Sequence, residues 1–260
     1  IPLVLTNFLQ VLFNMADIAV IGQFAGALSL GAVGSTTTLV TLFTGVLIGM
    51  AGGINVLVAR YFGARDKTST VHTIHTALLV SLITGIIVLV FGMIFSKGIL
   101  EIMNTKEELL NGAVLYIRIY FLGMPALALY NFGNAVCSAF GDTKKPLYYL
   151  SAAGVVNVVL NLFFVIVCKM DVAGVATASI ISQYLSAFLI LRALAKMGGD
   201  YALRLSELKF DKRMAKYIIQ IGLPAGLQNG IFQLANLFIQ AGVNTFDATM
   251  VAGNSAAANG

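Results

Sequence analysis

Long apolar segments separated by short clusters of charged residues constrain this chain more than any other feature of its sequence. One helical crossing of a lipid bilayer needs about 20 apolar residues, and the sequence supplies such segments repeatedly. The residues are 58% hydrophobic and 10% charged, whereas a soluble domain averages about 25% charged. The sequence therefore predicts an all-α membrane protein, a polytopic helical bundle.

We expect seven crossings and the start of an eighth. Their approximate ranges are 1–22, 34–59, 71–95, 110–140, 147–167, 172–194 and 217–243, with the eighth beginning near residue 248. A short uncharged loop at 24–31 should join the first two crossings. The long basic segment 192–216 should form an amphipathic linker at the membrane surface.

The first crossing carries a polar stripe. Asn7, Gln10, Asn14 and Asp17 follow one another at spacings of three, four and three, which places them on one helix face. A carboxylate at this depth is expensive and almost always faces a bundle interior or a wet cavity. The stripe therefore indicates either a functional acid at Asp17 or helix–helix contacts made through side-chain hydrogen bonds.

Two other crossings have unusual residues. The second is rich in threonine and glycine, and small residues at spacings of three and four let helices approach closely. The fourth contains Pro125, which removes a backbone donor and should kink the helix. It also contains Arg118, which either reaches the headgroup region or takes part in gating.

The basic residues indicate an orientation. If alternate connections lie on one side, the segments 60–70, 141–146 and 192–216 share that side and hold most of the lysines and arginines. Such a bias marks the cytoplasmic side of a membrane protein. We therefore expect a multi-pass membrane protein with these three segments in the cytoplasm. The scattered charge does not predict a nucleic-acid partner.

The seventh crossing repeats the first. Pro2, Leu5, Asn7, Leu12 and Asn14 match five residues of the seventh crossing at one constant offset: Pro224, Leu227, Asn229, Leu234 and Asn236. One repeat spans six crossings, an even number, so both copies point the same way, as in parallel repeats. We expect a six-helix lobe at 1–195, a linker at 196–216 and the start of a second lobe at 217–260. On this view the chain is a fragment of a twelve-helix protein.

Seven segments in this order resemble the multidrug and toxic compound extrusion (MATE) family, in particular its DinF-like bacterial branch. They are the pattern of residues 2–17, VGS at 33–35, ARYFGARD at 59–66, YIRIYFLG at 116–123, GDTKKP at 141–146, NVVLN at 157–161 and GVATASIISQ at 174–183. The resemblance implies a transporter of a bacterial inner membrane rather than an enzyme. It would be a cation-coupled antiporter, without a cofactor, that expels drugs or other organic cations in exchange for H⁺ or Na⁺.

The resemblance also implies a coupling site. It assigns the coupling carboxylate to Asp17, with Asn157, Asn161 and Ser179 facing it and Pro2 letting the first helix bend. The family branch usually carries an acid where this chain has Asn161. Because hard cations prefer carboxylate oxygens, a single carboxylate weakens the case for Na⁺ at Asp17 and leaves a one-proton switch. No other metal site is expected.

We expect the substrate cavity between the lobes. Its predicted lining comes from the first, second and seventh crossings: Gln10, Asn14, Thr37, Asn229, Gln233 and Asn236. The expected partners are small organic cations and membrane lipids, and the expected state is a monomer.

Two other functions fit parts of the sequence. A lipid-linked oligosaccharide flippase of the same superfamily would share the two-lobe plan, although its cavity usually carries basic residues, which these crossings almost lack. A membrane-embedded enzyme could use His72 and His75 as metal ligands, but no acid joins them and no His-Glu-x-x-His pattern exists.

Overall fold

The described part of the chain is helical. In a computed structural model, the structure describes residues 9, 17–103, 105–198, 201–204, 206 and 208–243. Within these ranges the chain forms helices joined by short connections and no strand. The prediction of an all-α helical bundle is confirmed.

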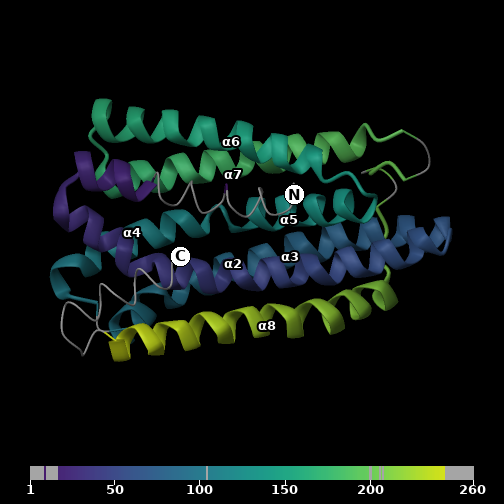
Figure 1. Cartoon of the computed structure of the whole chain (residues 1–260), viewed down its shortest axis with the longest axis horizontal. Coiled ribbons are helices and arrows are strands. Elements are labelled where there is room, and N and C mark those ends of the chain that lie inside the picture. The colour runs from purple at the N-terminus through teal and green to yellow at the C-terminus, as the bar shows by residue number, and fades with distance from the viewer. Residues whose placement is uncertain are drawn as a thin grey trace.

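The helices run along one common direction (Figure 1). Residues 17–24 are helical, and the later elements are α2 (Gly26–Gly63), α3 (Lys67–Ile102), α4 (Glu107–Phe121), α5 (Met124–Ala139), α6 (Lys144–Leu162), the π-helix η1 (Phe163–Val167), α7 (Asp171–Ala195) and α8 (Lys212–Val243). In the view of Figure 1, α6 and α7 lie on one side, α2, α3 and α8 on the other, and α4 and α5 between them.

Membrane crossing follows from the lengths and surfaces of these helices. Among the described residues, four helices are long and apolar enough to cross a membrane, and a fifth crossing results if α4 and α5 count as one. The outer face of α3 exposes Ile83, Ile87, Val90 and Ile94. Exposing such an apolar face to water would cost free energy, whereas exposing it to lipid tails does not.

Three connections lie at one end of the bundle (Figure 1). They are 63–67, 139–144 and the described part of 195–212. We call this end the connection end. An aromatic cluster links the three connections. The ring of Phe62 lies 4.7 Å from that of Phe140 and 5.6 Å from that of Tyr201, and the rings of Phe140 and Tyr201 are 5.6 Å apart. The three segments that we expected on one side of the membrane therefore lie together.

The expected loop at 24–31 is wrong. The helix of residues 17–24 is followed by a turn at Ala25, and α2 begins at Gly26. Gly26 has a φ of 86°, a left-handed conformation that glycine adopts without a side-chain clash. This single residue reverses the chain, so no longer loop is needed.

The fourth crossing is broken rather than continuous. α4 and α5 are bent by 46° at Leu122 and Gly123, just before Pro125. Pro125 lies in the first turn of α5, where its missing N–H removes no helical hydrogen bond. Arg118, in the last turn of α4, is exposed.

The segment before α8 packs across the start of α3. The backbone N–H of Leu203 donates to the carbonyl of Leu194 (3.1 Å), and the Leu203 side chain is buried. The hydroxyl of Thr76 donates to the carbonyl of Lys209 (3.4 Å) and accepts from the backbone N–H of Asp211 (3.1 Å). α8 then begins at Lys212, inside the segment 196–216 that we assigned to the linker.

α2 packs most extensively against α8, through glycines on both helices. A Cβ atom added to Gly49 would lie 2.1 Å from the backbone nitrogen of Gly226, and one added to Gly53 would lie 2.6 Å from that of Gly222. The two backbones therefore touch, as expected for small residues at a spacing of four.

The core consists of two apolar clusters. One lies at the connection end and includes Ile54, Phe132 and Ile190. The other, which includes Ile21 and Phe121, lies toward the opposite end. Buried polar side chains of α6 and α7, described next, lie between these clusters.

Two matched glycine substitutions test the contact between α2 and α8. Gly49→Ala places a methyl group inside the α8 backbone, so we expect a loss of stability of about 1–3 kcal/mol from overpacking. Gly52→Ala is the control, because its Cβ would meet nothing within 4 Å. Thermal unfolding in detergent should show a lower midpoint for Gly49→Ala only. Equal midpoints would contradict the described packing.

Candidate functional site

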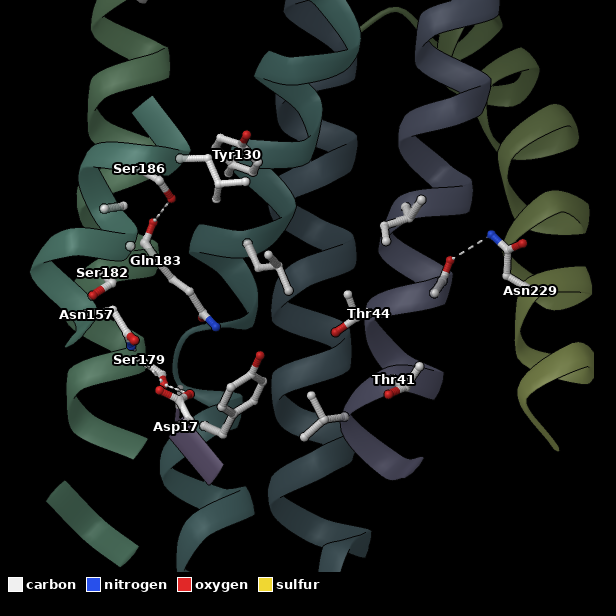
Figure 2. Close-up of a pocket in the computed structure, with 18 of the residues that line it drawn as sticks. Asp17, Thr41, Thr44, Tyr130, Asn157, Ser179, Ser182, Gln183, Ser186 and Asn229 are labelled. Carbon is white, nitrogen blue, oxygen red and sulfur yellow. Dashed lines mark hydrogen bonds between the residues drawn. The ribbon is translucent and has the colours of Figure 1, made fainter. Parts of the chain in front are cut away.

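Asp17 is buried, with 5% of its surface exposed, and accepts hydrogen bonds from two other helices (Figure 2). The Nδ2 group of Asn161, on α6, donates to Oδ1 of Asp17. The hydroxyl of Ser179, on α7, donates to Oδ2 over 3.0 Å. Both carboxylate oxygens therefore have a neutral donor, and no basic side chain among the described residues forms an ion pair with Asp17.

Asn157 completes this network. Its Oδ1 accepts a second hydrogen bond from Asn161 Nδ2 (3.1 Å), and its Nδ2 donates to the Ser179 hydroxyl (3.4 Å). Asn157 and Asn161 are four residues apart, so they lie on one face of α6, and the neighbouring α7 supplies Ser179. The structure therefore brings together the four residues that we named as the coupling site.

The network lies beside a local change in helix geometry. α6 ends at Leu162, directly after Asn161, and continues as the π-helix η1. Single π-turns inside longer helices occur frequently at functional sites. The last amide of the network is thus held where the helix widens.

A cavity of about 480 Å³ begins at Asp17. Its lining residues come from residue 17 and from α2, α4, α5, α6, α7 and α8: Asp17, Val40, Thr41, Thr44, Gly45, Ile48, Tyr120, Leu127, Tyr130, Leu150, Ala153, Gly154, Asn157, Ser179, Ser182, Gln183, Ser186, Asn229 and Phe232. In Figure 2, Asp17 lies at one end of the view, Tyr130 near the other, and Asn229 across from both. Among the described residues of this lining, Asp17 is the one that carries a charge.

Only part of the predicted substrate lining can be compared with this cavity. Asn229 lines it and donates to the carbonyl of Gly45 (3.5 Å). Gln10, Asn14 and Pro2, and the side chains of Gln233 and Asn236, lie outside the described part of the structure.

Thr37 lies on α2 before the part of that helix that borders the cavity. It is exposed, its hydroxyl bonds to the carbonyl of Val33, and it does not line the cavity. Thr41 and Thr44, one and two turns further along α2, take that place. The threonines recur over three turns of one helix, and their spacing does not distinguish the turn that borders the cavity.

Sequence reasoning missed most of the α7 wall. Ser179, Ser182, Gln183 and Ser186 all line the cavity. The last three follow Ser179 by three, four and seven residues, which places all four on one helix face. This stripe is visible in the sequence and could have been found there. The two tyrosines of the lining, Tyr120 and Tyr130, carry no comparable signal because aromatic residues in these helices are mostly core residues.

The two histidines have structural contacts near the connection end. Nδ1 of His72 lies 3.8 Å from Oδ2 of Asp211, and Nε2 of His75 accepts from the backbone N–H of Arg204 (3.4 Å). Among the described residues, no group of three or more His, Cys, Asp or Glu residues could hold a metal ion. Both histidines thus contact the segment that precedes α8.

Comparison with known proteins identifies the family. The family model described as MatE matches residues 2–163, more than half of the chain. The chain belongs to the MATE family. Its curated relatives include the probable multidrug resistance protein YpnP of Bacillus subtilis (strain 168), which is 31% identical over 258 residues, or 97% of this chain and 56% of the relative.

A second relative of this MATE chain is the multidrug export protein MepA of Staphylococcus haemolyticus (strain JCSC1435). It is 26% identical over 255 residues, which cover 96% of the chain and 54% of the relative. The chain thus spans about half the length of the curated relatives it matches.

Solved structures share the fold. A crystal structure of MATE in the bent conformation superposes with a TM-score of 0.91 at 24% identity, covering 100% of this chain and 58% of the other. The outward-facing conformation of a multidrug resistance MATE family transporter gives a TM-score of 0.84 at 24% identity, covering 92% and 53%. At this identity the likeness shows the fold alone.

Two serines of α7 test the carboxylate network. Ser179→Ala removes a donor from a buried carboxylate, so we expect a loss of stability of about 1.5–3 kcal/mol. Ser182→Ala is the matched control, since the hydroxyl of Ser182 bonds to the carbonyl of Ala178 in its own helix. Thermal unfolding in detergent at neutral pH should separate the two variants. A Ser182→Ala variant as unstable as Ser179→Ala would contradict the assigned network.

Proposed function

We propose that the protein is a secondary active antiporter that exports organic cations in exchange for H⁺, with Asp17 as the coupling carboxylate. The observation that carries this proposal is the position of Asp17, which belongs both to a buried hydrogen-bond network and to the wall of a cavity. The family and the printed names of the multidrug relatives support a transporter.

The charge of the cavity favours cationic substrates. Its described lining contains one carboxylate, several neutral polar groups and the aromatic rings of Tyr120, Tyr130 and Phe232. Aromatic faces attract organic cations, and a carboxylate attracts them more strongly. A lining without a basic side chain gives no support to a flippase for anionic lipid-linked sugars.

The donors around Asp17 favour H⁺ as the exchanged ion. The carboxylate faces an amide N–H and a hydroxyl, and these groups stabilise its charge without a metal ion. Na⁺ is a hard cation that is bound best by several oxygen ligands, preferably carboxylates, and here the second potential acid is Asn161.

Exchange follows if proton and substrate compete for this carboxylate. Ionised Asp17 attracts a cation into the cavity, and protonation removes that attraction and expels it. By linkage, each ligand must weaken the binding of the other to the same extent. We propose that protonation also lets the first helix bend near Pro2 and repack the lobe.

The contact of α2 with α8 supports a two-lobe arrangement. α8 carries the copy of the pattern found in the first crossing, and we assign it to the second lobe. Its asparagine Asn229 reaches the same cavity as Asp17. We propose that the cavity lies between the lobes and that the connection end faces the cytoplasm of a bacterium.

Efflux from proteoliposomes tests the proposed function, using the protein as its gene encodes it. A fluorescent organic cation is followed under an imposed pH gradient and, separately, under a Na⁺ gradient. We expect efflux under the pH gradient and its loss in Asp17→Asn, because the amide cannot take up or release the proton.

Glu101→Gln serves as the control for this substitution, since Glu101 is an exposed acid on α3 that pairs with Lys97 (3.7 Å). It should transport at the wild-type rate. Wild-type efflux by Asp17→Asn would refute the role of Asp17, and efflux driven only by Na⁺ would refute the choice of ion.

A further inference from the structure

Several buried polar atoms of this protein have no hydrogen-bond partner. Within the described part of the chain they are Thr44 Oγ1, Ser96 Oγ, Asn131 Nδ2, Asn134 Oδ1, Ser138 Oγ, Asn161 Oδ1 and Gln183 Oε1. Asn161 belongs to the carboxylate network, and Thr44 and Gln183 line the cavity. Three of the other four lie on α5, beyond the cavity.

These three residues form one stripe. Asn131, Asn134 and Ser138 are spaced by three and four residues, so they share one face of α5. Leu127 lies four residues before Asn131 and lines the cavity. The stripe therefore continues the cavity wall toward the connection end, and Asn131 is buried, with 5% of its surface exposed.

α2 supplies a polar group along the same course. Ile48 lines the cavity, and Asn55 lies two turns further along the same face of α2. The Nδ2 group of Asn55 donates to the carbonyl of Ala135, between Asn134 and Ser138, over 2.9 Å. A third asparagine thus lies beside the two in the α5 stripe.

The stripe ends near solvent. The carbonyl of Ser138 accepts a hydrogen bond from the backbone N–H of Gly141 (3.0 Å), in the turn between α5 and α6. The next residue, Asp142, forms an exposed ion pair with Lys145 (2.7 Å). The polar groups therefore extend from the cavity to a charged turn at the connection end.

Buried polar groups without partners are rare, because each loses its hydrogen bonds to water. Internal water that bridges such groups is the usual remedy, and each water needs two to four polar partners. Amide and hydroxyl groups on one helix face, opposed by Asn55 on α2, provide such partners. A chain of water molecules held by such groups conducts protons by hydrogen-bond exchange. It is too narrow for an organic cation to pass.

We propose that α5 and α2 hold a chain of internal water, along Asn131, Asn134 and Ser138, that carries protons between the cavity and the connection end. Its role in proton release rests on the proposed function. In that scheme the proton that leaves Asp17 passes through the cavity and along this stripe, while the substrate leaves by another route.

Silver ions test the hydration of the stripe, because Ag⁺ is small and reacts with thiols that water can reach. Ser138→Cys and Asn134→Cys are made in a protein that also carries Cys137→Ala and Cys168→Ser. The control retains Cys137, which is adjacent to Ser138 but buried in the apolar core, with 1% exposed. Purified protein in detergent is exposed to Ag⁺, and the remaining free thiol is counted by mass spectrometry after unfolding and alkylation.

We expect both introduced thiols to react at least about tenfold faster than Cys137, since reactivity follows exposure to water. Reaction of both no faster than Cys137 would overturn the proposal. The measurement needs no gradient and no substrate, so it is repeated with Asp17→Asn. Fast reaction in that background, together with proton-driven efflux at the wild-type rate, would refute the proposed function and leave the water chain intact.

Transport tests the proton role of the stripe. Asn134→Leu removes the polar group from its centre, so efflux driven by a pH gradient should fall at least about fivefold while the affinity for the organic cation in binding assays stays the same, because Asn134 does not line the cavity. Efflux at the wild-type rate would overturn the assignment of the stripe to protons.

Discussion

The buried carboxylate of Asp17 is the constraint on which the arrangement of the other helices depends. A lone acid at the centre of a membrane helix costs about 2.5–3.5 kcal/mol on insertion scales. Here α6 and α7 must lie side by side and present Asn161 and Ser179 to the same point. Each hydrogen bond to a charged group contributes about 1.5–3 kcal/mol, so the two donors roughly offset the cost. The acid is tolerated only in this packing. Because the cost of burying its charge and the contribution of its two hydrogen bonds nearly cancel, adding a proton changes the balance strongly.

The polar layer around Asp17 divides the interior. Apolar clusters at either end hold the helices together, and the cavity occupies the level between them. α2 and α8 touch backbone to backbone where Gly49 meets Gly226 and where Gly53 meets Gly222. We propose that a cavity bordered by such a contact changes width with little repacking, as the proposed exchange of an organic cation requires.

The sequence predicts the class of fold and part of the site for clear physical reasons. Apolar length and clustered charge are local properties, and they predict the crossings directly. The spacing of Asn157 and Asn161 likewise places both amides on one helix face. Their meeting with Asp17 is a contact between distant segments, and the family resemblance rather than periodicity predicted it. The break before Pro125 and the turn at Gly26 depend on backbone conformation. The spacing of the α2 threonines does not show which of several equivalent turns borders the cavity.

The central claim is that proton and substrate compete for Asp17, and proton release on substrate binding tests it most directly. Tetraphenylphosphonium is added to the purified protein in weakly buffered detergent solution, and the pH change is recorded beside the binding isotherm. At a pH where Asp17 is protonated, the account predicts release of about one proton per bound cation, as linkage requires, and no release from Asp17→Asn. Binding of the cation to the wild-type protein without proton release would contradict the account.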